Sequence, residues 1–308
     1  MTSGILRQPS SSPNRLFHGD AAAVLAALPQ DEALDLVYLD PPYAVGTVMT
    51  MRERAGESRG RKRTGSGRDA YVDGRDVDAL LAMLEPVLAG CRDRMSETAS
   101  LYLHMDWRAV HEAKVTADRV FGRRAFVGEV IWTPGNGSRG ARGFAVTHQT
   151  LLVYARDDRK RARHRVDHPL LREPYAPTSR EMHFTKVDAD GRTFRERVVA
   201  GKTYRYYADE GRRLGSVWTD IPAMTANTPL RREATGYPTQ KPERLLERIV
   251  RATTLEGDTV ADPMCGSGTT LLVAARLGRR FIGGDASAVA IETARRRLDA
   301  AGVAYQAR

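Results

Sequence analysis

Four consecutive residues, Asp40, Pro41, Pro42 and Tyr43, combine groups that can bind and orient an amino group. Neither proline has an N–H to donate, so this rigid segment presents the Asp40 carboxylate and a bare carbonyl as acceptors. The exocyclic amine of a nucleobase is a poor nucleophile because its lone pair is delocalised into the ring. Two acceptors that hold its hydrogens would favour a pyramidal nitrogen with its lone pair aimed at an electrophilic methyl group, while Tyr43 stacks on the base. The alternative is an Asp-Pro turn with Tyr43 in the core.

A glycine-rich segment further along the chain has the composition of a cofactor-binding turn. It lies between a predicted strand and a predicted helix, where small residues let a ligand approach the helix N-terminus. Asp285 follows about twenty residues later, where a carboxylate can accept hydrogen bonds from ribose hydroxyls. The segment lacks the Lys-Ser/Thr ending of a phosphate loop and the third glycine of a dinucleotide-binding motif, which favours a nucleoside cofactor without a pyrophosphate. The alternative is a purely structural turn. The segment consists of Asp262, Pro263, Met264, Cys265, Gly266, Ser267, Gly268 and Thr269.

The predicted strands and helices place these motifs at strand ends. A short apolar run, residues 34–39, is typical of a buried parallel strand and leads directly into Asp40. Strands and helices alternate along most of the chain, which indicates an α/β fold with a doubly wound, mostly parallel sheet. Such sheets bind ligands at the carboxyl ends of their strands. The other predicted strands are 15–17, 101–105, 126–132, 259–261 and 280–283, and the predicted helices are 21–28, 76–88 and 107–120, one after Pro242, one ending at Leu277 and one ending near Ala300.

Two segments interrupt this alternation. Residues 51–68 are rich in Arg, Gly and Ser and are expected to form a mobile loop. Residues 157–214 are dense in charge and are expected to form an inserted subdomain. Basic residues of the loop would close over DNA phosphates, although a solvated linker is a nearly equal alternative, and the same choice applies to 136–142. These candidate DNA contacts are Arg52, Arg54, Arg61, Lys62, Arg63, Arg139 and Arg142.

The overall composition favours a nucleic-acid partner. A net charge of +10 and a pI near 9.8 suit a polyanion, although an arginine-rich coding bias would give the same charge. Cys91 and Cys265 lack the spacing of a disulfide framework or a zinc site, so no metal is expected. His104 and His148 lie beside apolar strands and are interpreted as structural. Residues 1–14 lack the apolar core of a signal peptide and no run is long enough to span a membrane, so we expect a cytoplasmic protein.

Three further motifs complete a resemblance to the β class of DNA amino-methyltransferases. They are His18-Gly19-Asp20-Ala21, the run from Ser100 to Asp106, and Tyr237-Pro238-Thr239-Gln240-Lys241-Pro242. The resemblance implies a Rossmann-like, circularly permuted methyltransferase fold, S-adenosylmethionine as cofactor, and a base flipped out of double-stranded DNA. It also implies that Asp285 contacts the ribose. One departure is Met264, where the family commonly has Phe, and an adaptable apolar Met is compatible with binding. By this resemblance the cofactor pocket is completed by Asp20, Ala21, Thr239, Lys241 and Pro242.

The resemblance also divides the chain into a catalytic half at 15–156, a target-recognition insertion at 157–214 and a cofactor-binding half at 215–308. It favours adenine N6 as the methyl acceptor, with cytosine N4 as the alternative. A methyltransferase for RNA or for a protein amide is disfavoured by the aspartate at position 40 and by the order of the motifs. A non-catalytic DNA-binding subunit with a relic fold is the alternative from another class. A cognate restriction endonuclease and a homodimer are compatible with the resemblance, and the sequence demonstrates neither.

Overall fold

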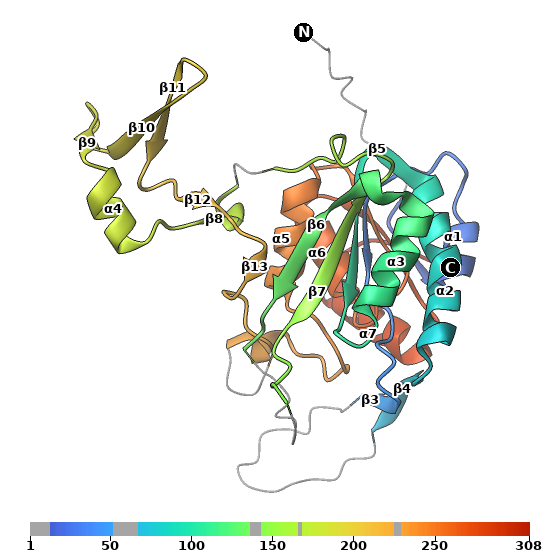
Figure 1. Ribbon diagram of the computed structural model, residues 1–308. Helices are drawn as coiled ribbons and strands as arrows, with labels where there is room; N and C mark the ends of the chain where they lie inside the picture. The colour runs from blue at the N-terminus through green and yellow to red at the C-terminus, as the bar shows by residue number, and fades with distance from the viewer. Residues whose placement is uncertain (1–12, 52–66, 136–142, 166–167, 225–228) are drawn as a thin grey trace, which may run out of the picture. The chain divides into compact units, whose positions relative to one another are not determined.

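The computed structural model describes residues 13–51, 67–135, 143–165, 168–224 and 229–308 (Figure 1). Contacts within the chain divide it into two compact units. The first, Met1–Arg163 with Val217–Arg308, contains the central sheet. The second, His164–Ser216, is an insertion between two strands of that sheet and overlaps the expected insertion at 157–214.

The described residues of the first unit form a nine-stranded sheet in the order β13-β6-β7-β5-β2-β14-β15-β1-β16. Neighbouring strands are parallel except where β7 pairs with β5 and β6. All residues of β2 are buried, as the apolar run at 34–39 predicts for a parallel strand covered on both faces. The expected mostly parallel sheet is confirmed. The strands are β1 Arg15–His18, β2 Leu34–Leu39, β5 Met95–Met105, β6 Phe126–Trp132, β7 Gln149–Ala155, β13 Val217–Trp218, β14 Thr259–Asp262, β15 Arg280–Asp285 and β16 Gln306–Ala307.

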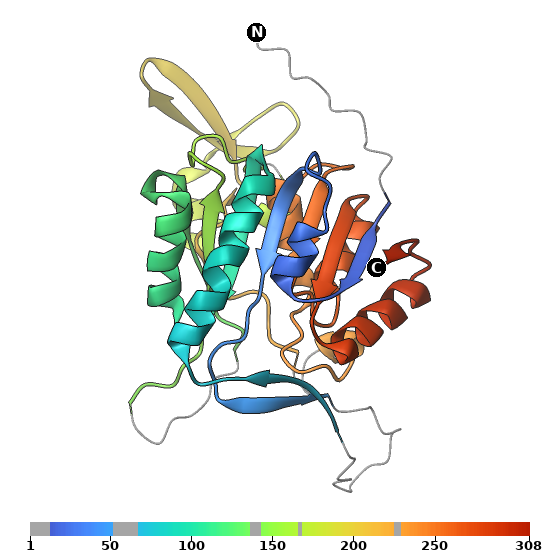
Figure 2. The same cartoon turned by 90° about the vertical axis from the view of Figure 1, so that its right-hand side faces the viewer.

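Helices cover both faces of this sheet (Figures 1 and 2). Gly283 and Gly284 are successive residues of β15 and therefore face opposite sides of the sheet. A helix approaches closely on each side. A Cβ on Gly283 would collide with Leu271 of α6, and one on Gly284 would collide with Val24 of α1. No helix in the described parts of the chain is long and apolar enough to cross a membrane. One layer contains α1 Ala21–Ala26, α2 Val77–Arg94 and α3 Val110–Phe121, followed by the turn η1 Arg123–Ala125; the other contains α5 Glu243–Thr253, preceded by η3 Pro229–Glu233, α6 Thr269–Arg276 and α7 Ala288–Ala300.

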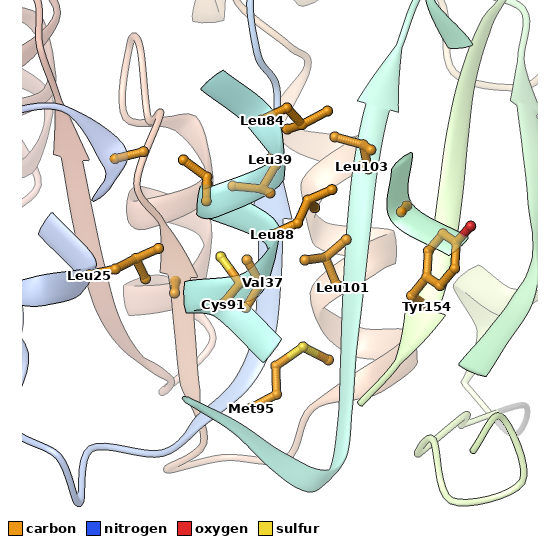
Figure 3. Close-up of a cluster of buried hydrophobic side chains, with 14 of the residues drawn as sticks. Leu25, Val37, Leu39, Leu84, Leu88, Cys91, Met95, Leu101, Leu103 and Tyr154 are labelled. Carbon is orange, nitrogen blue, oxygen red and sulfur yellow. The ribbon is translucent and has the colours of Figure 1, made fainter. Parts of the chain in front are cut away.

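The core on one face of the sheet lies between α2 and the strands β2 and β5 (Figure 3). Leu84, Leu88 and Cys91 of α2 are fully buried together with Val37 of β2 and Leu101 of β5. Each large apolar side chain buried in this way contributes about 1.5–3 kcal/mol to folding. This packing fixes the position of β2, whose carboxyl end leads into Asp40.

An antiparallel hairpin follows the Asp40–Tyr43 tetrapeptide and consists of β3 (Thr47–Met51) and β4 (Arg68–Asp73). The expectation of a loop over 51–68 is wrong at its two ends, because Met51 and Arg68 pair with each other in this hairpin. The interior, 52–66, lies outside the described residues, and so does 136–142. Seven candidate DNA contacts fall in these two ranges: Arg52, Arg54, Arg61, Lys62, Arg63, Arg139 and Arg142.

The second unit has a small sheet and an aromatic core of its own. Tyr175, Phe184 and Ala208 pack together, and the Arg195 guanidinium lies 5.1 Å from the ring centre of Phe184 and 5.4 Å from that of Tyr175. Three of its strands form an antiparallel sheet in the order β11-β10-β9, and β8 pairs with β12. Its elements are η2 Pro169–Leu171, β8 Arg172–Glu173, α4 Pro177–His183, β9 Lys186–Val187, β10 Thr193–Val199, β11 Lys202–Tyr207 and β12 Arg212–Arg213.

Candidate active site

Four neighbouring strands of the central sheet lead into aspartates that line one cavity. The strands β2, β14, β15 and β1 are parallel and adjacent, so their carboxyl ends lie at the same edge. Asp40 follows β2, Asp262 ends β14, Asp285 ends β15 and Asp20 comes shortly after β1. All four line a cavity of about 540 Å³. The tetrapeptide and the glycine-rich segment, far apart in sequence, therefore meet at one site.

The Asp40 carboxylate accepts one hydrogen bond on each oxygen. The Tyr43 hydroxyl donates to Oδ1, and the Lys241 ammonium donates to Oδ2. The side chains of Lys241 and Asp40 are 8% and 17% exposed, so the ion pair is largely shielded from water. Lys241, expected in the cofactor pocket, does line the cavity. Its ammonium also contacts Asp40 of the tetrapeptide.

The loop that carries the tetrapeptide is fixed by Asp73, the last residue of the β3–β4 hairpin. Its Oδ2 accepts the backbone N–H of Tyr43 and its Oδ1 accepts that of Val45, both at 3.0 Å. Between these two donors Ala44 has φ 56°, a left-handed conformation that residues with a Cβ rarely adopt. No local pattern predicts this contact, because Asp73 lies 30 residues beyond Tyr43 and belongs to no motif.

The Tyr43 ring, the expected stacking surface, is buried in this structure. Its exposed fraction is 7%, the Lys241 ammonium lies 5.2 Å from its centre, and the His104 ring lies 6.3 Å away. Burial raises the pKa of the Tyr43 hydroxyl, and the charge of Asp40 raises it further. The hydroxyl therefore stays protonated and donates to Asp40. Within the tetrapeptide, Asp40 and Pro42 line the cavity and Pro41 is buried.

His104 connects two polar side chains, those of Tyr38 and Gln149. Its Nδ1 lies 2.7 Å from the Tyr38 hydroxyl, and its Nε2 lies 2.8 Å from Gln149 Oε1. Burial lowers the pKa of His104 to about 3, so the ring is neutral and carries one N–H. Because Gln149 Oε1 only accepts, that N–H is on Nε2 and the Tyr38 hydroxyl donates to Nδ1. Both ring nitrogens are thus occupied, which agrees with a structural histidine.

The glycine-rich turn between β14 and α6 is bound to the end of β15. The Gly266 N–H donates to Asp285 Oδ2 at 2.9 Å, and the Ser287 N–H donates to Oδ1 at 2.8 Å. Gly268 has φ 73°, and a Cβ there would lie 2.7 Å from the Cβ of Ala294 in α7. Glycine is therefore required at 268 by the backbone conformation and by the close approach of α7.

Arg297 of α7 binds the same turn to α5. Its guanidinium donates to the Ser267 carbonyl at 3.0 Å and to Thr269 Oγ1 at 2.7 Å, and it pairs with Glu243 at 2.9 Å. The Arg297 side chain is 9% exposed, so the pair is shielded from water. Arg297 was not predicted, because one arginine in a run of three on the last helix has no local pattern that marks it.

The cavity is acidic. Burial raises the pKa of Asp262 to about 7, and the nearby charges of Asp40 and Asp285 act in the same direction. Burial also raises the pKa of Asp285. Among the described residues that line the cavity, Lys241 carries the one basic side chain. A ligand with positive charge would relieve the repulsion among the carboxylates.

Most of the predicted cofactor residues line this cavity. Two that do not line it are helix caps, since Pro242 precedes α5 and Gly268 precedes α6. Tyr71 and Tyr237 line it as well and were not predicted as site residues. The predicted residues along the cavity are Asp20, Ala21, Asp40, Pro42, Thr239, Lys241, Asp262, Pro263, Met264, Cys265, Gly266, Ser267, Thr269 and Asp285.

Residues 34–296 match the family model of the DNA methylases. The matched range contains the tetrapeptide, the inserted unit and the glycine-rich turn. The chain belongs to the DNA methylase family. The expected kinship with the DNA amino-methyltransferases is confirmed, and the chain is related to enzymes.

Relatives of this methylase cover nearly the whole chain. The type II methyltransferase M2.DpnII of Streptococcus pneumoniae is 26% identical over 305 residues, which are 96% of this chain and 94% of the relative. The DNA adenine methyltransferase YhdJ of Escherichia coli (strain K12) is 26% identical over 289 residues, which are 93% of this chain and 83% of the relative.

Solved methyltransferase structures share the fold of this methylase. The M1.HpyAVI–SAM complex superimposes with a TM-score of 0.55 at 17% identity and covers 92% of this chain and 98% of that one. The PvuII DNA methyltransferase, described as cytosine-N4-specific, gives a TM-score of 0.56 at 14% identity and covers 92% and 86%. These likenesses confirm the Rossmann-like methyltransferase fold.

Proposed function

We propose that this methylase transfers a methyl group from S-adenosylmethionine to the exocyclic amine of a base in double-stranded DNA, with adenine N6 favoured. The observation that carries the proposal is the placement of Asp40 at the carboxyl end of β2, on the cavity that the glycine-rich turn and Asp285 also line. An amine bound by Asp40 would face a cofactor bound by that turn.

The cavity suits S-adenosylmethionine. When bound, this cofactor supplies an electrophilic methyl group on a positively charged sulfur. Asp262 and Asp40 provide the negative surroundings that a sulfonium and an ammonium group require. The Asp285 oxygens are oriented by the N–H groups of Gly266 and Ser287 and keep lone pairs for ribose hydroxyls. Apolar residues such as Val87 and Met264 line the same cavity and suit an adenine ring.

Asp40 and the Pro41 carbonyl would orient the amine of the target base. The base has to leave the duplex to reach them, because an exocyclic amine is paired inside the helix. The amine would take the place of the Lys241 ammonium or the Tyr43 hydroxyl on the Asp40 carboxylate. Stacking on Tyr43 requires the ring, which is buried in this structure, to be uncovered when the base enters. Water then receives the proton that the amine releases.

The inserted unit, His164–Ser216, is our candidate for target recognition. Its β10–β11 hairpin carries exposed Arg197, Lys202, Tyr204 and Arg205. Basic side chains bind phosphates, and an aromatic ring between them offers a surface for sugar or base. This composition supports a DNA contact by the second unit.

The methylated base identifies the reaction. Purified protein is incubated with duplex DNA and S-adenosylmethionine, and the DNA is digested to nucleosides for mass spectrometry. We expect N6-methyladenine, because the relative YhdJ is a DNA adenine methyltransferase. N4-methylcytosine would establish the alternative acceptor, and retention of DNA without any methyl transfer would establish the non-catalytic subunit.

We also propose a restriction endonuclease as the genetic partner of this methylase. The support is the name of its relative M2.DpnII, a type II methyltransferase. Plasmid DNA methylated by the protein should resist cleavage by one endonuclease from a panel of known specificities. Sensitivity to every endonuclease whose site contains the methylated sequence would contradict this pairing.

A further inference from the structure

The tetrapeptide loop depends on a buried carboxylate outside every recognised motif. Asp73 is 1% exposed, and both of its oxygens are used by backbone N–H groups of one loop, those of Tyr43 and Val45. A buried carboxylate costs free energy unless it is hydrogen-bonded, and a buried N–H costs free energy unless it has an acceptor. The aspartate and the loop therefore satisfy each other.

The backbone between the two N–H groups is strained. Ala44 has φ 56°, and a residue with a Cβ stays in this region only where its surroundings impose it. Asp73 bonds the residue on each side of Ala44, so it holds the turn from both ends. The turn sets the direction in which the chain leaves the tetrapeptide and the position of Tyr43, whose hydroxyl donates to Asp40.

The hairpin that carries Asp73 also contacts the cofactor side of the cavity. The Tyr71 hydroxyl lies 3.4 Å from Thr239 Oγ1, next to a second strained position, since Thr239 has φ 59°. Ser287 lies two residues after Asp285, and its hydroxyl donates to the Ala70 carbonyl at 2.5 Å. One β-strand therefore bonds the tetrapeptide loop, the Thr239–Lys241 segment and the end of β15.

We propose that Asp73 is a positioning residue for methyl transfer. Through the β3–β4 hairpin it fixes the position of the tetrapeptide loop relative to the cofactor cavity. The proposal rests on the proposed function, because the loop matters for transfer only if Asp40 receives the amine. Asp73 is not among the described residues that line the cavity. Its contribution is the geometry of the acceptor, and a displacement of about 1 Å lowers a transfer rate roughly 100-fold.

The test compares Asp73→Asn with a matched change in the same strand. Asn keeps the size of the side chain but offers one acceptor and turns an NH₂ group toward the other backbone N–H. Asp69→Asn is the control, because Asp69 is exposed and, within the part of the chain that the structure describes, its side chain accepts one hydrogen bond, from the Thr50 hydroxyl at 3.4 Å. The measurements are kcat at saturating DNA and cofactor, the cofactor dissociation constant, Tm, and hydrogen exchange of the peptide that spans residues 40–46.

We expect Asp73→Asn to lower kcat by about 10- to 100-fold, to leave the dissociation constant within about threefold, and to speed exchange in the 40–46 peptide. Asp73→Ala, which removes both acceptors, should be at least as slow, and Asp69→Asn should match the unchanged protein. An unchanged kcat in Asp73→Asn would overturn the proposal. A global loss of Tm or of cofactor binding would also overturn it, since the role would then be structural. Hydrogen exchange does not require turnover. It therefore tests whether Asp73 holds the tetrapeptide loop even if the unchanged protein transfers no methyl group.

Discussion

The Lys241 ammonium donates to the Asp40 carboxylate from a position 201 residues further along the chain. This contact joins the tetrapeptide to the Thr239–Lys241 segment at the carboxylate that is proposed to hold the target amine. The ion pair therefore couples the proposed amine acceptor to a segment that lines the proposed cofactor site.

Replacing Lys241 by Met should slow methyl transfer. The change removes the charged hydrogen bond to Asp40 Oδ2 but keeps a long apolar side chain. The Asp40 carboxylate is then held less firmly, and its negative charge beside Asp262 is no longer paired with an ammonium. We therefore expect kcat to fall roughly 10- to 100-fold. Steady-state kinetics with Lys241→Arg as the charge-preserving comparison would measure this. A Met variant with the kcat of the unchanged protein would show that the ion pair has no part in transfer.

Cofactor binding should depend on pH through Asp262. Its pKa in the folded protein is about 7, so it is protonated in the empty cavity below that pH. A positively charged cofactor favours the ionised form, and binding below pH 7 must release a proton. Affinity should therefore rise from about pH 5 to pH 7 and then level off. Calorimetry over this range would measure the trend, and Asp262→Asn should flatten it; an unaltered slope in that variant would assign it to another group.

The same carboxylate affects folding stability. Asp262 has an ordinary pKa of 3.8 when unfolded and about 7 when folded, so the folded state binds more protons between these values. Its contribution to stability is present below about pH 4 and is lost as pH rises through 7. Urea unfolding without cofactor should show Asp262→Asn to be more stable than the unchanged protein at pH 8, with the difference shrinking toward pH 4. A constant difference across this range would contradict the assignment.

Loss of the Arg297 contacts should weaken cofactor binding. Arg297→Met removes the hydrogen bonds to Ser267 and Thr269 and leaves the glycine-rich turn less ordered. We expect the dissociation constant to rise about tenfold, equivalent to about 1.4 kcal/mol, while kcat at saturating cofactor changes little. Arg296→Met, an exposed neighbour on α7, is the control and should bind normally. Equal affinities for the two variants would show that Arg297 does not support cofactor binding.

A pair of glycine variants separates packing from backbone strain. Gly268 and Gly302 both have positive φ, 73° and 66°, but only a Cβ at 268 meets another atom, Ala294. The φ penalty of about 1 kcal/mol applies to both, and overpacking adds roughly 1–3 kcal/mol at 268. Thermal unfolding should show a clearly larger loss of Tm for Gly268→Ala than for Gly302→Ala. Equal losses would mean that α7 can move away from the turn.

The sequence predicted the parts of this site that are local. The apolar run before Asp40 and the small residues around Gly266 are recognisable because strand burial and tight turns impose them within a few residues. Asp73 and Arg297 could not be predicted, because each acts through contacts made only after distant elements pack. The β3–β4 hairpin could not be predicted for a related reason, because its strands flank a polar segment whose composition is typical of a loop. The sequence of β4 also lacks a long alternation of polar and apolar residues.

The proposed role of Asp40 is tested most directly by the rate of methyl transfer by Asp40→Ala, measured with labelled cofactor on duplex DNA. The control is Asp31→Ala, a change of an exposed aspartate just before β2. We expect kcat, measured at saturating cofactor, to fall by at least about 100-fold in Asp40→Ala and to stay unchanged in Asp31→Ala. Methylation by Asp40→Ala at the rate of the unchanged protein would show that Asp40 does not orient the amine.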